Sequence, residues 1–251
     1  MQTTYGKRRR INDVELGVRT IAPTFGRVQL QTHSPKAGHI VVDGQAERLV
    51  SHVLQMDPSV TFFAPQPFSL DLNEQRILRT KEQLTEARRK QATRKGPCLY
   101  TPDFCVTWSS HRKTVLEVKA KGFEGDAHYA AKLQMAKVIL ERHGYEFAVL
   151  VIPSSYDSPL AFNLQLLRQS RLHRTCLLEN ISSLLNDLHA AELTLGQACE
   201  ALQCTMRYAP ILVASGVLSM DIAHHAMHAN TPVMRAYGEL SHLSIVGGLM
   251  Q

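Results

Sequence analysis

The sequence predicts an α/β protein in which a larger N-terminal domain built around a sheet precedes a small, helical C-terminal domain. Three observations lead to this prediction. The residue patterns indicate an amphipathic helix from residue 45, a β-hairpin over residues 98–120, and a helix followed by a buried strand over residues 126–152. Short helical segments follow from about residue 180. A chain of 251 residues is long enough to bury one or two cores.

The first predicted element is a helix from Gln45 to Leu54. Its apolar residues fall at positions 46, 49, 50, 53 and 54, which is the spacing of a helix with one face in a core. Glu47 lies at the border of this apolar stripe. Two interpretations of Glu47 remain open: a ligand that reaches a metal beside the hairpin, and an ordinary solvated acid.

The next predicted elements are extended. Residues 60–70 have the composition of a strand interrupted by two prolines. A second strand is expected from about residue 98 to 108, followed by a turn over residues 109–112 and a returning strand over residues 113–120.

The hairpin collects charged residues on one face, because alternate side chains of a strand share a face. Glu117 and Lys119 are therefore expected to point one way, and Leu116 and Val118 into a core. A short turn would place Asp103 opposite Val118, next to the charged face. Two carboxylates and an ammonium group would then converge.

A helix and a strand follow the hairpin. Asp126 is expected to cap a helix that runs to His143 and stops at Gly144, with apolar residues at positions 129, 133, 136 and 140. Residues 145–152 form an apolar run closed by Pro153, which is typical of a buried strand.

The charged residues of the hairpin form a recognisable pattern. Pro102-Asp103, thirteen intervening residues and Glu117-Val118-Lys119 together give P-D…E-x-K. Carboxylate oxygens are the ligands that Mg²⁺ prefers, and a bound ion polarises a phosphate and lowers the pKa of a water. A lysine can stabilise the developing charge or position that water. The pattern therefore indicates phosphodiester hydrolysis, and the alternative is a surface hairpin whose charges are merely solvated.

With these residues the chain resembles the PD-(D/E)xK nuclease superfamily, which includes many restriction endonucleases. It resembles more specifically the TnsA endonuclease subunit of heteromeric TnsA/TnsB transposases. The residues that carry the resemblance are Gln45-Ala46-Glu47-Arg48, Gln66-Pro67, Tyr100-Thr101-Pro102-Asp103-Phe104 and Leu116-Glu117-Val118-Lys119. The resemblance extends to a small helical domain after residue 171 and so covers most of the chain.

The resemblance implies the architecture. Residues 1–171 are expected to form a restriction-endonuclease-like domain with a mixed sheet, preceded by a basic N-terminal arm. Residues 172–251 are expected to form a winged-helix-like domain that engages other transposition proteins. A helix over residues 179–189 and a helix-turn-helix pair over residues 195–202 and 206–214 fit this expectation.

The resemblance also implies the site. Glu47, Asp103, Glu117 and Lys119 are expected to be the catalytic set, although some relatives carry glutamine in place of Glu117. We expect Mg²⁺, for which Mn²⁺ can substitute, to bind Asp103, Glu117 and the backbone carbonyl of Val118, with Glu47 bound directly or through water.

The implied activity is cleavage of the strands that end 5′ at each transposon end. A TnsB-type DDE transposase would cut the 3′ ends and perform strand transfer, and a TnsC-type AAA+ ATPase would activate both. Two rival interpretations remain open. One is a stand-alone restriction- or repair-type nuclease with its own target choice. The other is a non-catalytic DNA-binding adaptor with a degenerate nuclease fold.

Charge is unevenly distributed along the chain. Residues 1–179 hold 26 lysine and arginine residues against 17 acidic residues, a net charge of +9, whereas residues 180–251 hold 2 against 5, a net charge of −3. Basic clusters favour the phosphate backbone of DNA, and a solvated helix face or a tail is the alternative. The residues expected to contact DNA are Lys7, Arg8, Arg9, Arg10, Arg88, Arg89, Lys90, Arg94, Lys95 and Lys121.

The same asymmetry separates the two domains. An acidic surface repels phosphate, so the C-terminal domain is expected to bind a protein and not DNA. TnsC is the first expected partner and TnsB the second. Zinc is not expected at His224 and His228, because the middle of the pattern carries no glutamate.

The sequence also predicts a cytoplasmic protein without a membrane anchor. No apolar stretch approaches the roughly 20 residues that span a bilayer. The first ten residues, MQTTYGKRRR, lack the apolar segment of a secretory signal. The five cysteines are odd in number and include no C-x-x-C pair, which is typical of a reducing compartment.

Overall fold

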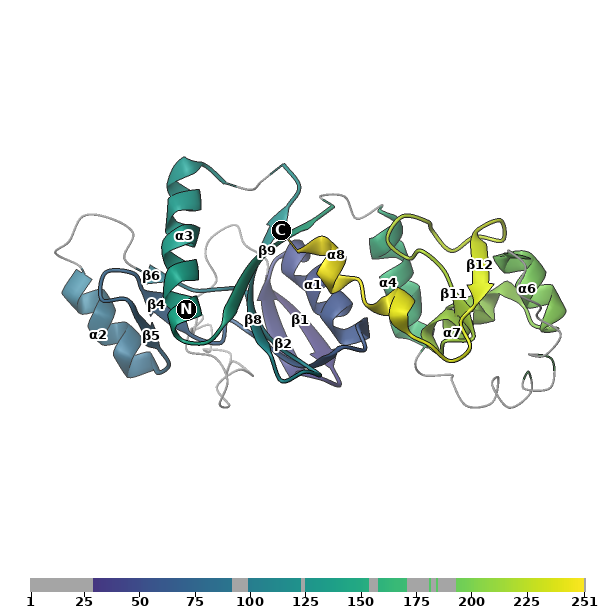
Figure 1. Ribbon diagram of the computed structural model, residues 1–251, viewed down its shortest axis with the longest axis horizontal. Helices are drawn as coiled ribbons and strands as arrows, with labels where there is room; N and C mark the ends of the chain where they lie inside the picture. Colours follow the sequence, from purple (N-terminus) through teal and green to yellow (C-terminus); the bar gives the residue numbers. More distant parts are fainter. Residues whose placement is uncertain are drawn as a thin grey trace, which may run out of the picture. The chain divides into compact units, whose positions relative to one another are not determined.

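A computed structural model describes residues 29–91, 99–122, 125–153, 158–170, 181, 184 and 193–250 (Figure 1). The chain divides into two compact units. The first unit comprises Met1–Val50, Val60–Ile152 and Met250–Gln251, and the second comprises Ser51–Ser59 and Pro153–Leu249. The N-terminal arm with Lys7, Arg8, Arg9 and Arg10 lies outside the described residues, as do Arg94 and Lys95.

The first unit is built on a four-stranded mixed sheet. Its strands are β3 (Val60–Pro65), β7 (Phe104–Trp108), β8 (Lys113–Ala120) and β9 (Glu146–Ile152), in the order β3-β7-β8-β9. The first two pairings are antiparallel, whereas β8 and β9 are parallel because a helix connects them. The predicted α/β fold with a mixed sheet is confirmed for this unit.

The hairpin differs from the prediction in two respects. The strand expected from residue 98 to 108 is two strands, β6 (Leu99–Tyr100) and β7, because Pro102 has no N–H with which to continue a ladder. Phe104 pairs with Leu116, which brings Asp103 opposite Glu117 and not opposite Val118. The returning strand has the predicted bounds.

Strand β8 is also more buried than the prediction implied. Its residues from Thr114 to Val118 are all buried, so both of its faces are covered. Glu117, expected on the face opposite the core residues Leu116 and Val118, is only 4% exposed. The charged face of the hairpin therefore lies inside the molecule.

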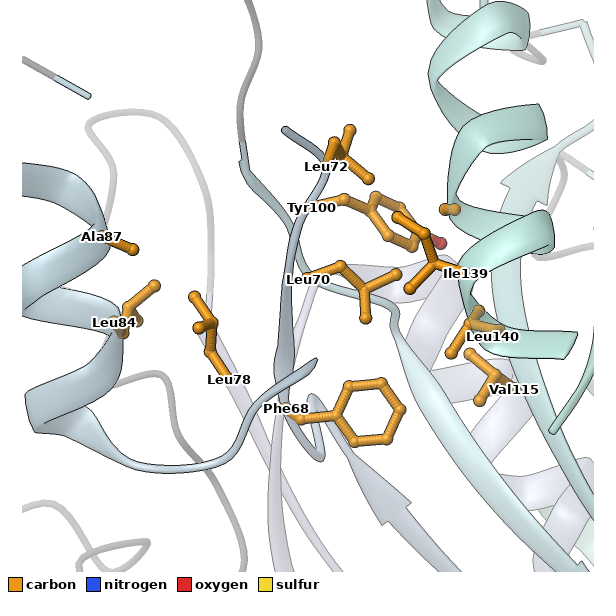
Figure 2. Packing of buried hydrophobic residues seen from close by; sticks show 11 residues of the cluster. Phe68, Leu70, Leu72, Leu78, Leu84, Ala87, Tyr100, Val115, Ile139 and Leu140 are labelled. Carbon is orange, nitrogen blue, oxygen red and sulfur yellow. The ribbon is translucent and has the colours of Figure 1, made fainter. Parts of the chain in front are cut away.

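A second, small sheet in the first unit has the order β5-β4-β6, with β4 (Ser69–Asp71) and β5 (Arg76–Leu78). Helix α2 (Lys81–Gln91) buries only Leu84 and Ala87. Figure 2 shows these two side chains facing the strands, whose other side meets Ile139 and Leu140 of the helix between β8 and β9. One apolar core thus joins α2, the small sheet and that helix.

The helix between β8 and β9 is α3 (Ala127–Arg142). Asp126 caps it by accepting a hydrogen bond from the backbone N–H of Tyr129 at 2.8 Å. Gly144, with φ +79°, follows its C-terminal end. Both predicted boundaries are confirmed.

Three elements precede the mixed sheet. Strands β1 (Gln29–Ser34) and β2 (Gly38–Asp43) form an antiparallel hairpin that the sequence did not predict. Helix α1 (Gln45–Met56) confirms the helix predicted from Gln45. Glu47 lies in its first turn and is buried at 9% exposure.

The second unit begins earlier than the expected boundary at residue 171. Helix α4 (Pro159–Ser170) packs against α7 (Ala209–Ala214), and the buried Asn163 bonds the backbone of Ile222, His225 and Met227. These contacts place α4 with the C-terminal elements, so the chain divides after Ile152.

The remaining elements of the second unit are short. They are β10 (Leu193–Thr194), α6 (Leu195–Ala201), η4 (Met206–Tyr208), β11 (Leu218–Ser219), β12 (Pro232–Arg235), η5 (Ser241–Leu243) and α8 (Val246–Leu249). The three strands form an antiparallel sheet in the order β10-β12-β11. The helix predicted over residues 179–189 lies almost wholly outside the described residues.

Among the described residues, no helix has both the length and the apolar character needed to span a membrane.

Candidate active site

Asp103 is held rigidly at the break between β6 and β7. Its backbone N–H donates to the Leu116 carbonyl at 3.2 Å, and its carbonyl accepts from the Gln66 N–H at 2.8 Å. Its carboxylate Oδ2 accepts from the Val118 N–H at 2.7 Å. This last bond explains how Asp103 reaches Val118 although its strand register places it opposite Glu117.

The carboxylate of Asp103 lies among other negative charges. Burial, and then the carboxylates of Glu117 and Glu47, raise the pKa of Asp103 well above its ordinary value of 3.8. The Val118 N–H and the Lys119 ammonium oppose this shift without cancelling it. Three acids therefore share one region with a single adjacent lysine.

Glu117 is surrounded by donors. Its Oε2 accepts from the Tyr100 hydroxyl at 2.6 Å. Its Oε1 accepts from the Lys119 ammonium at 2.8 Å and also from the Tyr129 hydroxyl. These three bonds fix the orientation of a carboxylate that has almost no contact with solvent.

Lys119 is fixed by the same group of residues. Its Nζ donates to Glu117 and to the Tyr129 hydroxyl, the latter at 2.9 Å, and its side chain is 17% exposed. The ammonium also lies 4.2 Å from the centre of the Tyr129 ring, within the range of a cation–π contact. The lysine is thus adjacent to the carboxylates and still reachable from solvent.

Glu47 joins the site from α1. Its Oε2 accepts from the Asp43 N–H at 2.9 Å, and its charge is felt at Asp103. Gln66 connects the two regions, since its Nε2 donates to Asp43 Oδ2 at 3.2 Å while its backbone bonds Asp103. Of the two open interpretations of Glu47, its burial excludes the solvated acid.

Two tyrosines complete the site, and the sequence analysis did not assign either to it. Tyr100 appeared in the sequence analysis only as the first residue of the motif from Tyr100 to Phe104. Tyr129 appeared only as one of the apolar positions of the predicted helix. Burial, and then the charge of Glu117, raise the pKa of Tyr100 well above its ordinary value, so its hydroxyl stays a donor. The sequence signal that could have assigned these tyrosines to the site is a hydroxyl-bearing side chain at a core-facing position close to the acidic motif.

The residues present fit a hard divalent cation. Asp103 and Glu117 offer oxygen ligands, and a cation would offset the repulsion that raises the pKa of Asp103. Within the described parts of the chain, no three histidine, cysteine or acidic side chains come together closely enough to hold an ion by themselves. Mg²⁺ commonly takes one or two carboxylates and completes its shell with water and substrate phosphate.

The basic residues expected at DNA divide into two groups. Arg88, Arg89 and Lys90 are exposed in the last turn of α2, where Lys90 also pairs with Glu86 at 3.0 Å. Lys121 is exposed directly after β8, two residues beyond Lys119. The remaining members lie outside the described residues.

Lys132 of α3 is a further cation near the site. Its Nζ lies 5.8 Å from the centre of the Tyr100 ring. The sequence analysis did not include it among the DNA contacts, because a lone lysine on a helix carries no cluster signal.

Comparison with known proteins identifies a family that part of the chain resembles. Residues 57–151 match a family model described as the TnsA-like endonuclease N terminal. No curated protein matches the chain. The matched segment runs from before β3 almost to the end of β9, and it contains Asp103, Glu117 and Lys119 but not Glu47. The expected resemblance to TnsA is therefore confirmed over this segment, which is similar to the N-terminal endonuclease domain of TnsA-like proteins.

Proposed function

We propose that the chain is a Mg²⁺-dependent DNA endonuclease that cuts the strands ending 5′ at transposon ends. The observation that carries this proposal is the convergence of Asp103, Glu117 and Lys119 inside a TnsA-like endonuclease domain. Burial of several acids next to one lysine reduces the stability of the fold. Such an arrangement is typical of catalytic sites, and metal-assisted hydrolysis would require it.

Each residue has a distinct part in the proposed reaction. Asp103 and Glu117 would hold Mg²⁺ together with the Val118 carbonyl, and Glu47 would act through water. The ion, when bound, would polarise the scissile phosphate and lower the pKa of a water. Lys119 would stabilise the charge that grows on the phosphate or orient the attacking water. In-line attack would leave a 5′-phosphate and a 3′-hydroxyl.

The exposed cations support DNA as the substrate. Arg88, Arg89 and Lys90 present three adjacent charges to solvent, and Lys121 is an exposed charge two residues beyond Lys119. Contacts of this kind bind the phosphate backbone without reading sequence. Choice of the transposon end would then come from a partner, which agrees with a nuclease that acts inside a transposase.

The second unit suits a winged-helix-like domain that binds protein. Its element order β10, α6, η4, α7, β11, β12 and its three-stranded antiparallel sheet support this proposal. In a DNA-reading helix-turn-helix the second helix enters the major groove. Here all six residues of α7 are buried, so this helix has no face to offer to DNA. The net charge of −3 over residues 180–251 supports the same conclusion.

TnsC is the first partner that we propose for this unit, and TnsB is the second. An acidic surface suits a basic or mixed protein partner, with electrostatics steering the encounter. The exposed Met234 and Tyr237 supply apolar area of the sort that interfaces bury.

The decisive test is cleavage of labelled transposon-end DNA by this protein, with and without its TnsB and TnsC partners, in Mg²⁺ and in EDTA. We expect 5′-strand cleavage that requires metal and the partners. Asp103→Ala and Glu117→Ala should each lower the rate by on the order of a thousandfold, because each removes a carboxylate from the ion. Thermal melting of the variants would show that they remain folded.

The other outcomes identify the rival functions. Cutting at a defined sequence by the isolated chain would identify a stand-alone nuclease. DNA binding without cleavage in any mixture would identify a non-catalytic adaptor. Wild-type rates in folded Asp103→Ala protein would show that the site is elsewhere.

A further inference from the structure

The hydroxyl of Tyr129 lies between two members of the acidic site. It accepts a hydrogen bond from Lys119 Nζ at 2.9 Å and donates one to Glu117 Oε1. The ring of the same tyrosine lies 4.2 Å from the lysine ammonium. Tyr129 therefore contacts Lys119 with both its polar and its aromatic parts.

These contacts restrict a side chain that is otherwise flexible. A lysine ammonium has three N–H donors on a four-carbon stem with many rotamers. Two of the three donors are taken, one by Glu117 and one by Tyr129. The direction of the third N–H is thereby set, and that donor remains available to a water or a phosphate oxygen.

We infer that Tyr129 is a positioning residue that holds the Lys119 ammonium in the orientation needed for phosphodiester cleavage. This inference rests on the proposed nuclease function. Tyr129 need not touch the DNA or the metal, since it acts through the lysine. Its loss should slow the chemical step and leave DNA affinity unchanged.

The neighbouring backbone is shaped to admit this ring. Gly125 has φ +100°, and a Cβ built on it would lie 2.9 Å from Tyr129 Cδ1. A residue with a Cβ at position 125 would contact the ring too closely, so the ring would have to shift. Gly122, on the same connection between β8 and α3, has φ +87° and nothing within 4 Å of such a Cβ. The two glycines thus share the left-handed backbone, but only Gly125 makes room for the tyrosine.

Tyr100 provides a useful contrast. Its hydroxyl bonds the other oxygen of Glu117, Oε2, and no hydrogen bond joins it to Lys119. Removal of the Tyr100 hydroxyl should therefore disturb the carboxylate, whereas removal of the Tyr129 hydroxyl should disturb the lysine as well. The difference between the two tyrosines can be measured as the chemical reactivity of the Lys119 ammonium.

The first experiment measures single-turnover cleavage of transposon-end DNA by the complete transposase mixture. Tyr129→Phe keeps the ring and its contact with the ammonium but removes the hydroxyl. We expect the rate to fall on the order of tenfold, the size of one hydrogen bond to a charged group, with unchanged DNA affinity. Tyr145→Phe is the matched control, because Tyr145 also bonds a cation, Arg79 at 3.2 Å, but lies outside the site.

The same change is then made in a Lys119→Ala background. If Tyr129 acts through Lys119, the added Tyr129→Phe should cost no more than an added Tyr100→Phe, which also removes one hydrogen bond to Glu117. A second tenfold loss in that background would overturn the inference, because the hydroxyl would then act independently of the lysine.

A second experiment does not depend on activity. Trace labelling with acetic anhydride, followed by mass spectrometry, reports how readily Lys119 reacts relative to Lys137, whose side chain is 44% exposed. We expect Tyr129→Phe to raise the relative reactivity of Lys119 severalfold, and Tyr100→Phe and Tyr145→Phe to leave it unchanged. Unchanged reactivity in Tyr129→Phe would overturn the inference, whereas a wild-type protein that labels as expected but never cleaves would overturn only the nuclease proposal.

Alanine variants of the two glycines test the position of the Tyr129 ring independently. Gly125→Ala should increase labelling of Lys119 as Tyr129→Phe does, because it displaces the ring without altering its chemistry. Gly122→Ala imposes the same backbone strain and should leave Lys119 as in the wild type. Equal labelling in the two alanine variants would contradict the role assigned to the ring.

Discussion

Strand β8 and helix α7 are both buried, but only β8 buries a charged residue among its apolar ones. In the first unit, β8 buries Glu117 at 4% exposure and surrounds it with donors from Tyr100, Tyr129 and Lys119. In the second unit, α7 buries six residues that are all apolar. A buried charge reduces stability unless it is fully bonded, whereas buried apolar groups contribute to it directly.

The difference indicates how each unit is used. In the first unit, burial and then the neighbouring carboxylates raise the pKa of Asp103, an arrangement that is explained by chemistry and not by packing. The second unit places all of α7 in its core, which leaves contact with other molecules to its remaining surface. Three measurements test this difference between the two units.

The largest effect is expected in the core of the second unit. Leu212 is fully buried in α7, so Leu212→Ala should lower the free energy of unfolding of that unit by about 2–5 kcal/mol through lost apolar contact and a residual cavity. Far-ultraviolet circular dichroism during urea unfolding would show an earlier transition. Fluorescence of the single tryptophan, Trp108 of β7, should keep its midpoint because it reports the first unit.

Met234→Ala is the control for this change, because Met234 is 57% exposed and should contribute little. A shift of the Trp108 transition as large as that of the circular dichroism signal would show that the two units unfold together.

An intermediate effect is expected for the cations of α2. Replacement of Arg88, Arg89 and Lys90 by glutamine should weaken DNA binding about tenfold at low salt, uniformly across sequences. It should also flatten the salt dependence, since each lost phosphate contact removes about 0.9 from the slope of log K against log salt. Fluorescence anisotropy at several salt concentrations measures both quantities.

The matched control replaces three other cations of the first unit, the exposed Arg112 and Lys113 and the half-buried Lys137, and changes the net charge equally. Equal weakening by both triple variants would indicate a general charge effect and no DNA-binding role for α2. A loss confined to one DNA sequence would instead indicate base recognition.

The smallest effect concerns the pH dependence of stability in the absence of metal. The pKa of Asp103 is raised in the folded protein, so between its ordinary value of 3.8 and the raised value the folded state holds a proton that the unfolded state releases. This proton makes folding less favourable as pH rises through that window. Asp103→Asn should therefore gain stability relative to the wild type as pH increases from about 4 towards neutrality.

Denaturant unfolding at pH 4 and pH 7 in EDTA measures the difference between the two proteins. A variant that loses stability relative to the wild type as pH rises would show that Asp103 is not crowded by Glu117 and Glu47. Added Mg²⁺ should reduce the advantage of the variant, because the ion favours the ionised carboxylate.

The elements that could be predicted from the sequence are those whose boundaries and periodicity are local. The apolar stripe of α1, the Asp126 cap and Gly144 stop of α3, and the bounds of β8 all follow from residues within one element. The spacing from Asp103 to Glu117 was equally local, since one hairpin contains both. Helix α2 was not predicted because it buries only Leu84 and Ala87 and so leaves almost no apolar pattern.

What surrounds Glu117 depended on the tertiary structure. The donors come from β6, from β8 itself and from α3, and no sequence spacing relates Tyr100 and Tyr129 to the carboxylate that they bond. The burial of α7 and the association of α4 with the second unit were likewise decided by packing between distant segments. Periodicity reports which side of one element faces a core, but only the assembled fold determines which side chains meet there.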